Sequence, residues 1–217
     1  MNKKIFDAYN FLLESNDIER VKKILVRYEL YKLSQEIPGD ILECGVFKGT
    51  GHIFWLKLLK IFDPNSLKKV IGFDTFEDFT KTALKFERSA AKSFLKEANF
   101  NSKNLFQIVE SKIKNSNLED RSILIKGDIK KTSKAYVKNN RGFRISLLHL
   151  DLDTYEGTKS ALINFFPHIS PGGVIILDEY GSRGWGESEA VDEFLNKKNL
   201  KLRKVKFSSK PTAYIIK

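Results

Sequence analysis

From Asp40 onward, short apolar runs alternate with longer amphipathic stretches, and this alternation is the strongest constraint on the fold. Runs that are apolar throughout are typical of strands buried on both faces of a parallel sheet, and the stretches between them suit crossover helices. The sequence therefore predicts an α/β fold with a doubly wound, mostly parallel sheet. The runs that predict its seven strands are Ile41–Val46, Lys69–Asp74, Ile123–Lys126, Ile145–Asp151, Gly173–Leu177, Leu202–Phe207 and Ala213–Ile216.

Three further segments complete this predicted architecture. The turn-rich stretch Ser208–Pro211 separates the last two runs, which predicts an antiparallel hairpin at the end of the sheet. The apolar spacing within Ile18–Leu33 predicts an amphipathic helix in an N-terminal helical extension, residues 1–38. Residues 77–121 are polar, helical in pattern and far longer than an ordinary connection. We interpret them as a helical insertion after the second strand, which forms either a lid or additional packing.

Length and composition set the class of protein. A chain of 217 residues with 41% hydrophobic content is sufficient for one sizeable core, so we predict a single domain, residues 1–217. Asp7 and Glu14 interrupt the N-terminal apolar stretch, and no later run is long enough to span a bilayer. Cys44 is the only cysteine, so an internal disulfide is excluded. We therefore expect a cytoplasmic protein without a membrane span.

The net charge of +11 is compatible with a nucleic-acid surface, an anionic membrane or an anionic small substrate. Most of the excess is lysine scattered along the chain. The densest patch, between Lys126 and Arg144, contains few aromatic residues and is typical of a solvated helix face. We therefore expect no nucleic-acid partner.

The first predicted strand runs into the segment Glu43-Cys44-Gly45-Val46-Phe47-Lys48-Gly49-Thr50-Gly51, and a helix is predicted from His52 to Ile61. Gly45 and Gly49 allow the backbone to turn tightly and to approach a ligand, and the helix offers unpaired amides at that edge. The spacing lacks the Gly-x-Gly-x-x-Gly pattern of dinucleotide sites. By itself the segment fits a ligand loop and a plain strand-to-helix turn equally well.

Acidic residues end the next two predicted strands. Asp74, followed by Thr75 and Phe76, lies where a carboxylate can accept hydrogen bonds from both hydroxyls of a ribose. In Lys126-Gly127-Asp128-Ile129, the acid and its apolar neighbour either bracket an adenine or form a turn and a helix cap.

Further carboxylates follow the fourth and fifth predicted strands. Asp151 lies at a central strand tip, whereas Asp153, with Glu156 three residues later, has the pattern of a helix N-terminal box. Asp178 and Glu179 end the fifth strand. Three converging carboxylates, Asp151, Asp178 and Glu179, would repel one another unless a cation bound between them. Oxygen ligands suit magnesium, with manganese or calcium as alternatives.

The remaining candidate side chains allow two interpretations each. His52, His149 and His168 are not spaced as a zinc site, and His149 fits a core histidine near the ligand crevice. Trp185, in a glycine-rich loop, either stacks on a sugar ring or packs. Arg183 in the same loop is suited to pair with an anionic substrate group.

Taken together, four motifs resemble the macrocin O-methyltransferase family of class I methyltransferases, which depend on S-adenosylmethionine. The motifs are Gly39-Asp40-Ile41-Leu42-Glu43-Cys44-Gly45-Val46, Phe73-Asp74-Thr75-Phe76-Glu77, Leu150-Asp151-Leu152-Asp153-Thr154-Tyr155, and Ser170-Pro171-Gly172-Gly173 running to Asp178-Glu179-Tyr180-Gly181. The resemblance extends from about Gly39 to the end of the chain, and residues 78–122 are outside it.

The resemblance implies a Rossmann-like sheet, S-adenosylmethionine as cofactor and magnesium as metal. The family usually has two aspartates where this chain has Asp178 and Glu179. The implied cofactor site comprises Glu43, Cys44, Gly45, Val46, Phe47, Gly49, Thr50, Asp74, Thr75, Phe76, Gly127, Asp128, Ile129 and Asp151. The implied metal ligands are Asp151, Asp178 and Glu179, and the candidate substrate contacts are Tyr155, Tyr180, Arg183 and Trp185.

We predict a magnesium-dependent O-methyltransferase that acts on a hydroxyl of a small molecule, a deoxysugar that is nucleotide-linked or carried by a lipid or polysaccharide. Asp151, Asp153 and His149 are the candidates for the catalytic base. One alternative is a metal-independent methyltransferase acting on nitrogen or RNA. Another is a non-catalytic module that binds the cofactor and a partner protein. The family resemblance also suggests a homodimer or larger assembly.

Overall fold

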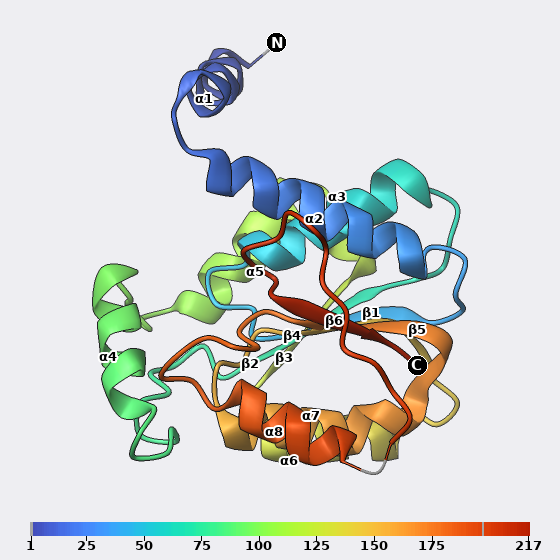
Figure 1. Ribbon diagram of the computed structural model, residues 1–217. Coiled ribbons are helices and arrows are strands. Elements are labelled where there is room, and N and C mark those ends of the chain that lie inside the picture. The colour runs from blue at the N-terminus through green and yellow to red at the C-terminus, as the bar shows by residue number, and fades with distance from the viewer. Residues whose placement is uncertain (1, 197) are drawn as a thin grey trace.

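The computed structural model describes residues 2–196 and 198–217; Met1 and Lys197, which belong to the predicted domain 1–217, lie outside the described residues. Helices and strands alternate along the chain (Figure 1). Their bounds are α1 (Lys3–Glu14), α2 (Ile18–Ser34), β1 (Asp40–Cys44), α3 (Thr50–Phe62), β2 (Val70–Asp74), α4 (Arg88–Glu97), α5 (Leu105–Asn115), η1 (Glu119–Arg121), β3 (Ser122–Lys126), α6 (Ile129–Asn139), β4 (Ile145–Leu150), α7 (Tyr155–Phe165), η2 (Phe166–His168), β5 (Ile169–Leu177), α8 (Glu187–Leu195) and β6 (Ala213–Ile216).

The strands form one sheet in the order β3-β2-β1-β4-β5-β6, in which only β6 is antiparallel to its neighbour within the described chain. The order reverses between β1 and β4, and β4 is buried along its whole length. This confirms the predicted α/β, doubly wound, Rossmann-like fold. The reversal matters for function because ligands of such sheets bind beyond the carboxyl ends of the strands at that point.

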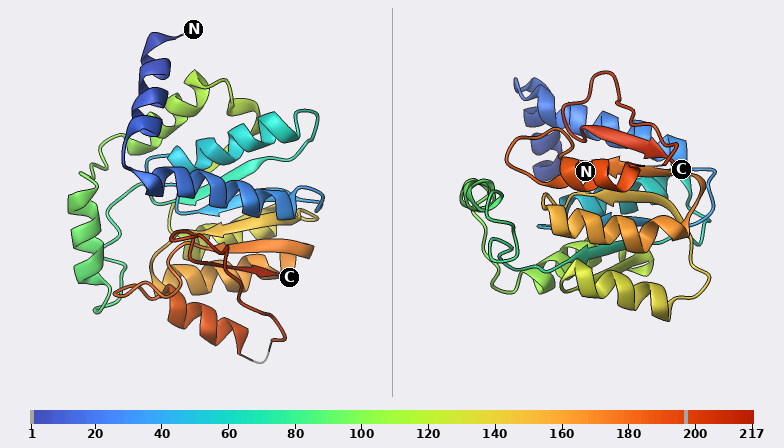
Figure 2. Two further views of the ribbon diagram at one scale, coloured as in Figure 1. Left: turned by 45° about the horizontal axis from the view of Figure 1, so that its top comes forward. Right: turned by 60° about the horizontal axis from the view of Figure 1, so that its bottom comes forward.

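Helices cover both faces of the sheet (Figures 1 and 2). On one face, α2, α3 and α5 bury residues such as Val26, Trp55 and Val109 against Ile41 and Leu147. On the other face, α6, α7 and α8 pack against alternate strand residues, which include Leu42, Cys44 and Leu148. Successive strand residues point to opposite faces, so the uniformly apolar strands supply two cores at once.

The prediction of seven strands is wrong by one, because the described residues form six. The segment Leu202–Phe207 makes a single bridge, between Arg203 and Tyr214, in place of a strand. Pairing stops there because the chain turns early: the amide of Ser208 donates to the carbonyl of Val205 at 2.9 Å. The predicted closing hairpin is therefore reduced to β6 and one bridge.

The Pro171-Gly172-Gly173 turn, predicted to precede the fifth strand, lies within β5. The pairing register between β4 and β5 shifts at this point, from Ile145 opposite Ile169 to Leu147 opposite Val174. The extra residues form an irregularity of the bulge kind, which lets the strand continue past a proline. The strand therefore begins four residues earlier than predicted, at Ile169.

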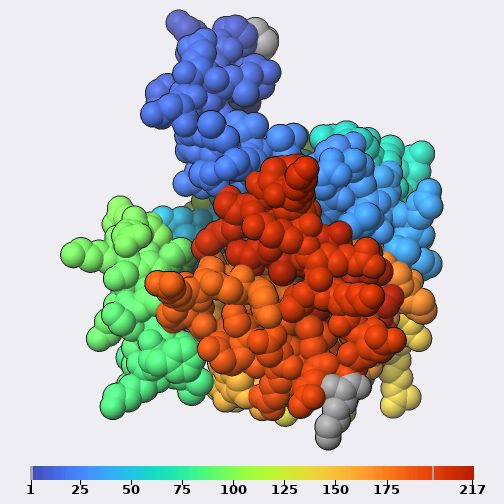
Figure 3. All heavy atoms as spheres, in the orientation of Figure 1, coloured from blue at the N-terminus to red at the C-terminus, as the bar shows by residue number. Residues whose placement is uncertain are grey.

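The N-terminal extension and the insertion are helical, as predicted. The helix α1 projects away from the rest of the protein and contains no buried residue, whereas α2 lies along the sheet (Figures 1 and 3). The insertion contains α4, α5 and η1, and α4 stands at one side of the sheet in Figure 1. No helix of the described chain is long and apolar enough to cross a membrane.

Candidate functional site

A cavity of about 580 Å³ opens at the carboxyl ends of the parallel strands. It brings together most of the residues predicted to bind a cofactor, which come from four different strand ends. Of the predicted set, Glu43, Gly45, Val46, Phe47, Thr50, Asp74, Thr75, Gly127, Asp128, Ile129 and Asp151 line it. Asp153, Asp178 and Glu179 lie in the same wall.

The loop after β1 is shaped by Gly45, which has φ of +98°. A Cβ built on Gly45 would lie 1.8 Å from the carbonyl oxygen of Asp151, so no other residue fits there without displacing the end of β4. Phe47 also has a positive φ, 51°, which aims its amide at the carboxylate of Asp74. The loop therefore stays close to the floor of the cavity.

Asp74, at the end of β2, is held by two backbone amides. Its Oδ2 accepts from Phe47 N at 2.7 Å, and its Oδ1 accepts from Phe76 N at 2.6 Å. Burial raises the pKa of Asp74, although these amides oppose the shift by favouring the ionised form. Each carboxylate oxygen retains further acceptor capacity for a ligand hydroxyl.

Asp128 is the N-cap of α6, and its Oδ1 accepts from the amide of Lys130 at 2.9 Å. The structural alternative for this residue, a turn and cap, is therefore confirmed. Gly127 before it has φ of +139°, and both residues line the cavity beside Ile129.

Three residues of the predicted cofactor set do not line the cavity as the structure describes it. Cys44 is fully buried in the core on the α6–α8 side of the sheet. Phe76 turns into the opposite core and packs edge-on against Phe106, with ring centroids 5.1 Å apart. Gly49 faces Val109, which would lie 2.8 Å from a Cβ at that position. Motif membership placed these residues near the ligand, but the side chains of Cys44 and Phe76 point into the core, and the Cα of Gly49 faces Val109.

Beside the glycine loop, buried acids and histidines form a connected group. Glu43 lies between His149, with Oε1 3.4 Å from Nδ1, and His52, with Oε2 3.5 Å from Nδ1. The other ring nitrogen of His149, Nε2, is 3.2 Å from Oδ1 of Asp178. Ligand atoms of His149, Asp151 and Asp178 all lie within 4.8 Å of one another.

The charges in this group shift one another's pKa values. Burial raises the pKa of Asp151 to about 7, and the charge of Asp178 adds to the shift. Burial also favours neutral Glu43, but the adjacent rings of His149 and His52 outweigh it and lower the pKa of Glu43 to about 2. Against burial, the neighbouring carboxylates of Asp178 and Glu43 raise the pKa of His149. The group thus contains a carboxyl that titrates near neutral pH.

The predicted cap role of Asp153 is wrong. Thr154 is the N-cap of α7, and Asp153 precedes it in a left-handed conformation with φ of 60°. That conformation turns its carboxyl into the cavity wall, where burial, followed by the charges of Asp151 and Glu179, raises the pKa of Asp153. Asp153 therefore belongs to the acidic group.

Glu179 is placed differently from the other predicted metal ligands. One of its carboxylate oxygens pairs with the ammonium of Lys210, and the other, Oε2, is buried without a hydrogen-bond partner among the described residues. Its amide receives support from Glu187, whose Oε1 accepts it at 2.9 Å.

None of the predicted substrate contacts lines the cavity in the part of the chain that the structure describes. The hydroxyl of Tyr155 donates to Glu193, and that of Tyr180 donates to Asp192 at 2.8 Å, both on α8. Trp185 packs near Phe79 and Phe94 of the insertion, and Arg183 is exposed. The contacts of Tyr155, Tyr180 and Trp185 therefore lie outside the lining of the cavity.

The cavity also contains residues that the motifs did not reveal. The helix α2 contributes Arg20, Lys23 and Arg27, and the Nζ of Lys23 is 3.5 Å from Oδ2 of Asp178. The insertion contributes further lining residues, Phe79, Thr82, Phe94, Ala98 and Phe100. The i, i+3, i+7 spacing of the three basic residues was the available signal, because it places them on one helix face.

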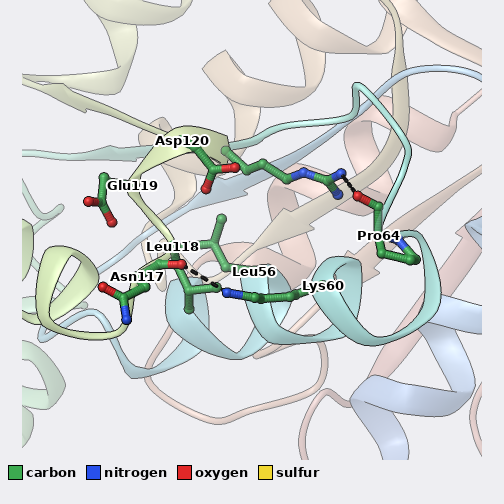
Figure 4. A pocket seen from close by; sticks show the side chains of 8 residues that line it. Leu56, Lys60, Pro64, Asn117, Leu118, Glu119 and Asp120 are labelled. Atoms are coloured by element: carbon green, nitrogen blue, oxygen red, sulfur yellow. Dashed lines mark hydrogen bonds between the residues drawn. The ribbon is translucent and has the colours of Figure 1, made fainter.

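A second cavity, of about 360 Å³, lies at the opposite edge of the sheet, before β2 and β3 begin (Figure 4). Its charged side chains support the backbone: Lys60 Nζ donates to the carbonyl of Asn117 at 3.2 Å, and Arg121 donates to that of Asp63 at 2.8 Å. None of the predicted site residues lines it.

A family model, curated relatives and solved structures all show similarity between this chain and O-methyltransferases. The family model described as macrocin-O-methyltransferase (TylF) matches residues 19–208. The 8-demethyl-8-(2,3-dimethoxy-alpha-L-rhamnosyl)-tetracenomycin-C 4'-O-methyltransferase of Streptomyces olivaceus is 29% identical over 149 residues, covering 68% of this chain and 55% of that protein. The mycinamicin III 3''-O-methyltransferase of Micromonospora griseorubida is 28% identical over 151 residues, again covering 68% of this chain and 58% of that protein. The chain thus spans a little over half the length of these relatives.

Among solved structures, the apo form of CalS11, a TDP-rhamnose 3'-O-methyltransferase in calicheamicin biosynthesis, is 26% identical with a TM-score of 0.73. The similarity covers 100% of this chain and 86% of that one. Since the family model covers most of the chain and the strand-end acids occupy one cavity, the chain belongs to the macrocin O-methyltransferase family.

Proposed function

We propose that this protein transfers a methyl group from S-adenosylmethionine to a hydroxyl group of a sugar, with the help of a divalent cation such as magnesium. The observation that carries the proposal is the cavity, in which Asp74 and the glycine loop lie beside the acids of β4 and β5. Sugar O-methyltransfer by the similar tetracenomycin, mycinamicin and rhamnose enzymes supports the substrate class. We propose a small sugar substrate in preference to a nucleic acid.

The cofactor half of the site is assigned to Asp74, Gly45 and Asp128. Asp74 is placed to accept hydrogen bonds from the ribose hydroxyls, and Gly45 lets the backbone approach the sulfonium end. Gly127 and Ile129, beside Asp128, form an apolar wall suited to the adenine.

The acid half fits a hard cation. Ligand atoms of Asp151 and Asp178 lie within 4.8 Å of each other and of His149, so we propose these two acids as ligands. Glu179 lies outside that close group, and we propose it as the third ligand because its buried Oε2 lacks a hydrogen-bond partner in the described chain. A bound divalent cation would supply Lewis-acid polarisation of the substrate hydroxyl. His149 holds Asp178 in orientation through the 3.2 Å contact of Nε2.

We assign Asp151 as the base that accepts the proton of the substrate hydroxyl. It lines the cavity at the end of β4, beside the other acids of this group. Asp153 is a poorer base because burial and the charges of Asp151 and Glu179 raise its pKa and disfavour its ionised form, and His149 is fully buried between Glu43 and Asp178. The insertion residues Phe79 and Phe94 cover the cavity and help exclude water.

One observation favours a metal-independent variant of this reaction. Lys23 and Lys210 already pair with Asp178 and Glu179, two of the three proposed ligands. In that case the lysines would neutralise the acids, and methyl transfer would survive a chelator.

The test measures S-adenosylhomocysteine binding by calorimetry and methyl transfer to nucleotide-linked deoxysugars such as TDP-rhamnose, with magnesium or with a chelator. Asp178→Asn should abolish transfer while S-adenosylhomocysteine affinity stays within about threefold, because the acid is assigned to the acceptor side. Asp7→Asn, an exposed acid on α1, is the control and should retain both. Parallel loss of binding and transfer in Asp178→Asn would contradict the assignment, and undiminished transfer in chelator would establish the metal-independent variant.

A further inference from the structure

Arg27 is a buried cation that faces the cavity and forms no direct ion pair with the described residues. Its side chain comes from α2, only 7% of the residue is exposed, and it lines the cavity. Its Nε has no hydrogen-bond partner, and no carboxylate of residues 2–196 and 198–217 lies within 4.0 Å of the guanidinium. Arginine remains charged at all relevant pH values, so burial in this state is costly unless an anion binds.

The position of the guanidinium is fixed by its neighbours on α3, which packs beside α2 (Figure 2). The guanidinium carbon lies 5.6 Å from the centre of the Trp55 ring. A Cβ on Gly51 would lie 3.2 Å from each terminal nitrogen of Arg27. The absent side chain at Gly51 therefore leaves the guanidinium room at the first turn of α3.

The start of α3 is itself suited to an anion. The N-cap is Gly49, and among described residues no side chain caps this helix end. The first amides of a helix have no intrahelical partner, and the helix dipole favours negative charge there. Thr50 and Gly51, whose amides belong to this first turn, line the cavity. Arg27 and the helix end thus converge on the same corner.

The nearby carboxylates Glu43 and Asp178 already have other partners. Glu43 lies between His149 and His52, and Asp178 contacts His149 and Lys23. Arg27 influences this group by charge, since it helps to lower the pKa of Asp178, but its own hydrogen-bonding groups remain available to a ligand.

This corner lies over β1, between the strand that ends in Asp74 and the strand that precedes Asp151: Glu43 is paired with Gly72 of β2 and with His149 of β4. A cofactor that extends from the ribose acceptor Asp74 toward Asp151 must place its amino-acid portion here. We propose that Arg27, together with the N-terminus of α3, binds the carboxylate of the methionine part of S-adenosylmethionine. This inference rests on the proposed function.

The experiment compares two ligands that differ only in that carboxylate: S-adenosylhomocysteine and its decarboxylated analogue, S-adenosyl-3-thiopropylamine. Calorimetry is done on the wild-type chain and on Arg27→Met, which keeps the aliphatic length and removes the charge. Arg27→Met should weaken S-adenosylhomocysteine about 10- to 100-fold, the usual value of a charge-assisted contact, and leave the analogue unchanged. Arg27→Lys should lose part of that affinity.

Lys22→Met is the control, because Lys22 is a basic residue of the same helix that pairs with Glu19 and does not line the cavity. It should bind both ligands as the wild-type chain does. Equal weakening of both ligands by Arg27→Met would reveal a merely structural role and overturn the inference. Equal affinity of the wild-type chain for the two ligands would overturn it without any variant, while leaving cofactor binding intact. Failure of the wild-type chain to bind either ligand would instead refute the proposed function.

Discussion

At the scale of single residues, Gly45 marks the closest approach between two strand ends. Its φ is +98°, and a Cβ would lie 1.8 Å from the Asp151 carbonyl oxygen. Gly45→Ala therefore combines backbone strain with a collision that displaces the end of β4. We expect a loss of more than about 4 kcal/mol of unfolding free energy, or failure to fold, measured by urea denaturation.

Gly142 provides the matched control for this substitution. It has a similar φ of +84°, but a Cβ there would meet nothing within 4 Å. Gly142→Ala should cost only about 1–2 kcal/mol, the strain of the left-handed conformation. Equal costs at the two positions would mean that the contact with Asp151 is unimportant.

Asp151 supplies a second prediction at this scale. Its pKa rises from 3.8 to about 7 on folding, so between these values the folded chain binds a proton that the unfolded chain has released. Its contribution to stability is therefore present at low pH and is lost as the pH rises from about 4 to about 7. Asp151→Asn removes that loss. In chelator, its melting temperature should exceed that of the wild-type chain by about 3 °C or more at pH 8, with a smaller difference at pH 4. If the difference in melting temperature between Asp151→Asn and the wild-type chain were the same at both pH values, the pH-dependent loss of stability would not come from Asp151.

Strand-end acids such as Asp74 and Asp178 could be predicted from the sequence, because parallel strands end at one edge and a local motif is enough to place them there. Lys210 could not be predicted, because its local pattern is typical of solvent-exposed charge. The helical spacing of Arg27 places it on one face with Arg20 and Lys23, but only tertiary packing shows that this face covers the cavity. Asp153 was misassigned because its spacing from Glu156 imitates a cap, whereas its positive φ is invisible in a spacing pattern.

At the scale of elements, Asp128 begins α6 with a side-chain cap. Asp128→Ala removes that acceptor and should destabilise the protein by about 1 kcal/mol, which lowers the melting temperature by about 2–4 °C. Asp128→Asn keeps a cap oxygen and should melt as the wild-type chain does. If both variants lose the same stability, the negative charge rather than the cap is what matters.

Element types were more predictable than element ends. The apolar run of β4 and the amphipathic spacing of α2 are strong local signals, and both elements formed. Leu202–Phe207 has apolar residues at positions 202, 205 and 207, but Ser208 closes a turn onto Val205 and ends the pairing after one bridge. The insertion escaped detailed prediction because Glu87, fully buried within it, is held by distant partners: its Oε1 accepts from the amide of Tyr155 at 2.6 Å.

At the scale of the whole molecule, α1 stands apart from the body of the protein (Figure 3). Its apolar side chains include Ile5, Tyr9 and Phe11, which are 68%, 58% and 78% exposed. Because α1 contains no fully buried residue, deleting residues 2–15 should change the melting temperature of the monomer by less than about 2 °C. Leu30→Ala in α2, where the side chain is 1% exposed, should instead cost about 2–5 kcal/mol. A large drop in melting temperature after this deletion, measured at low protein concentration, would show that α1 stabilises the fold.

The burial of Cys44 makes the chain convenient for spectroscopic labelling. It is the only thiol in the sequence, it is sealed in the core, and burial raises its pKa well above the ordinary value, so little reactive thiolate forms. A cysteine introduced at Thr82, an exposed residue of the cavity wall, would be the one site open to a maleimide dye. A fluorophore there would report how the insertion moves as donor and acceptor bind, in a protein whose native cysteine is left in place.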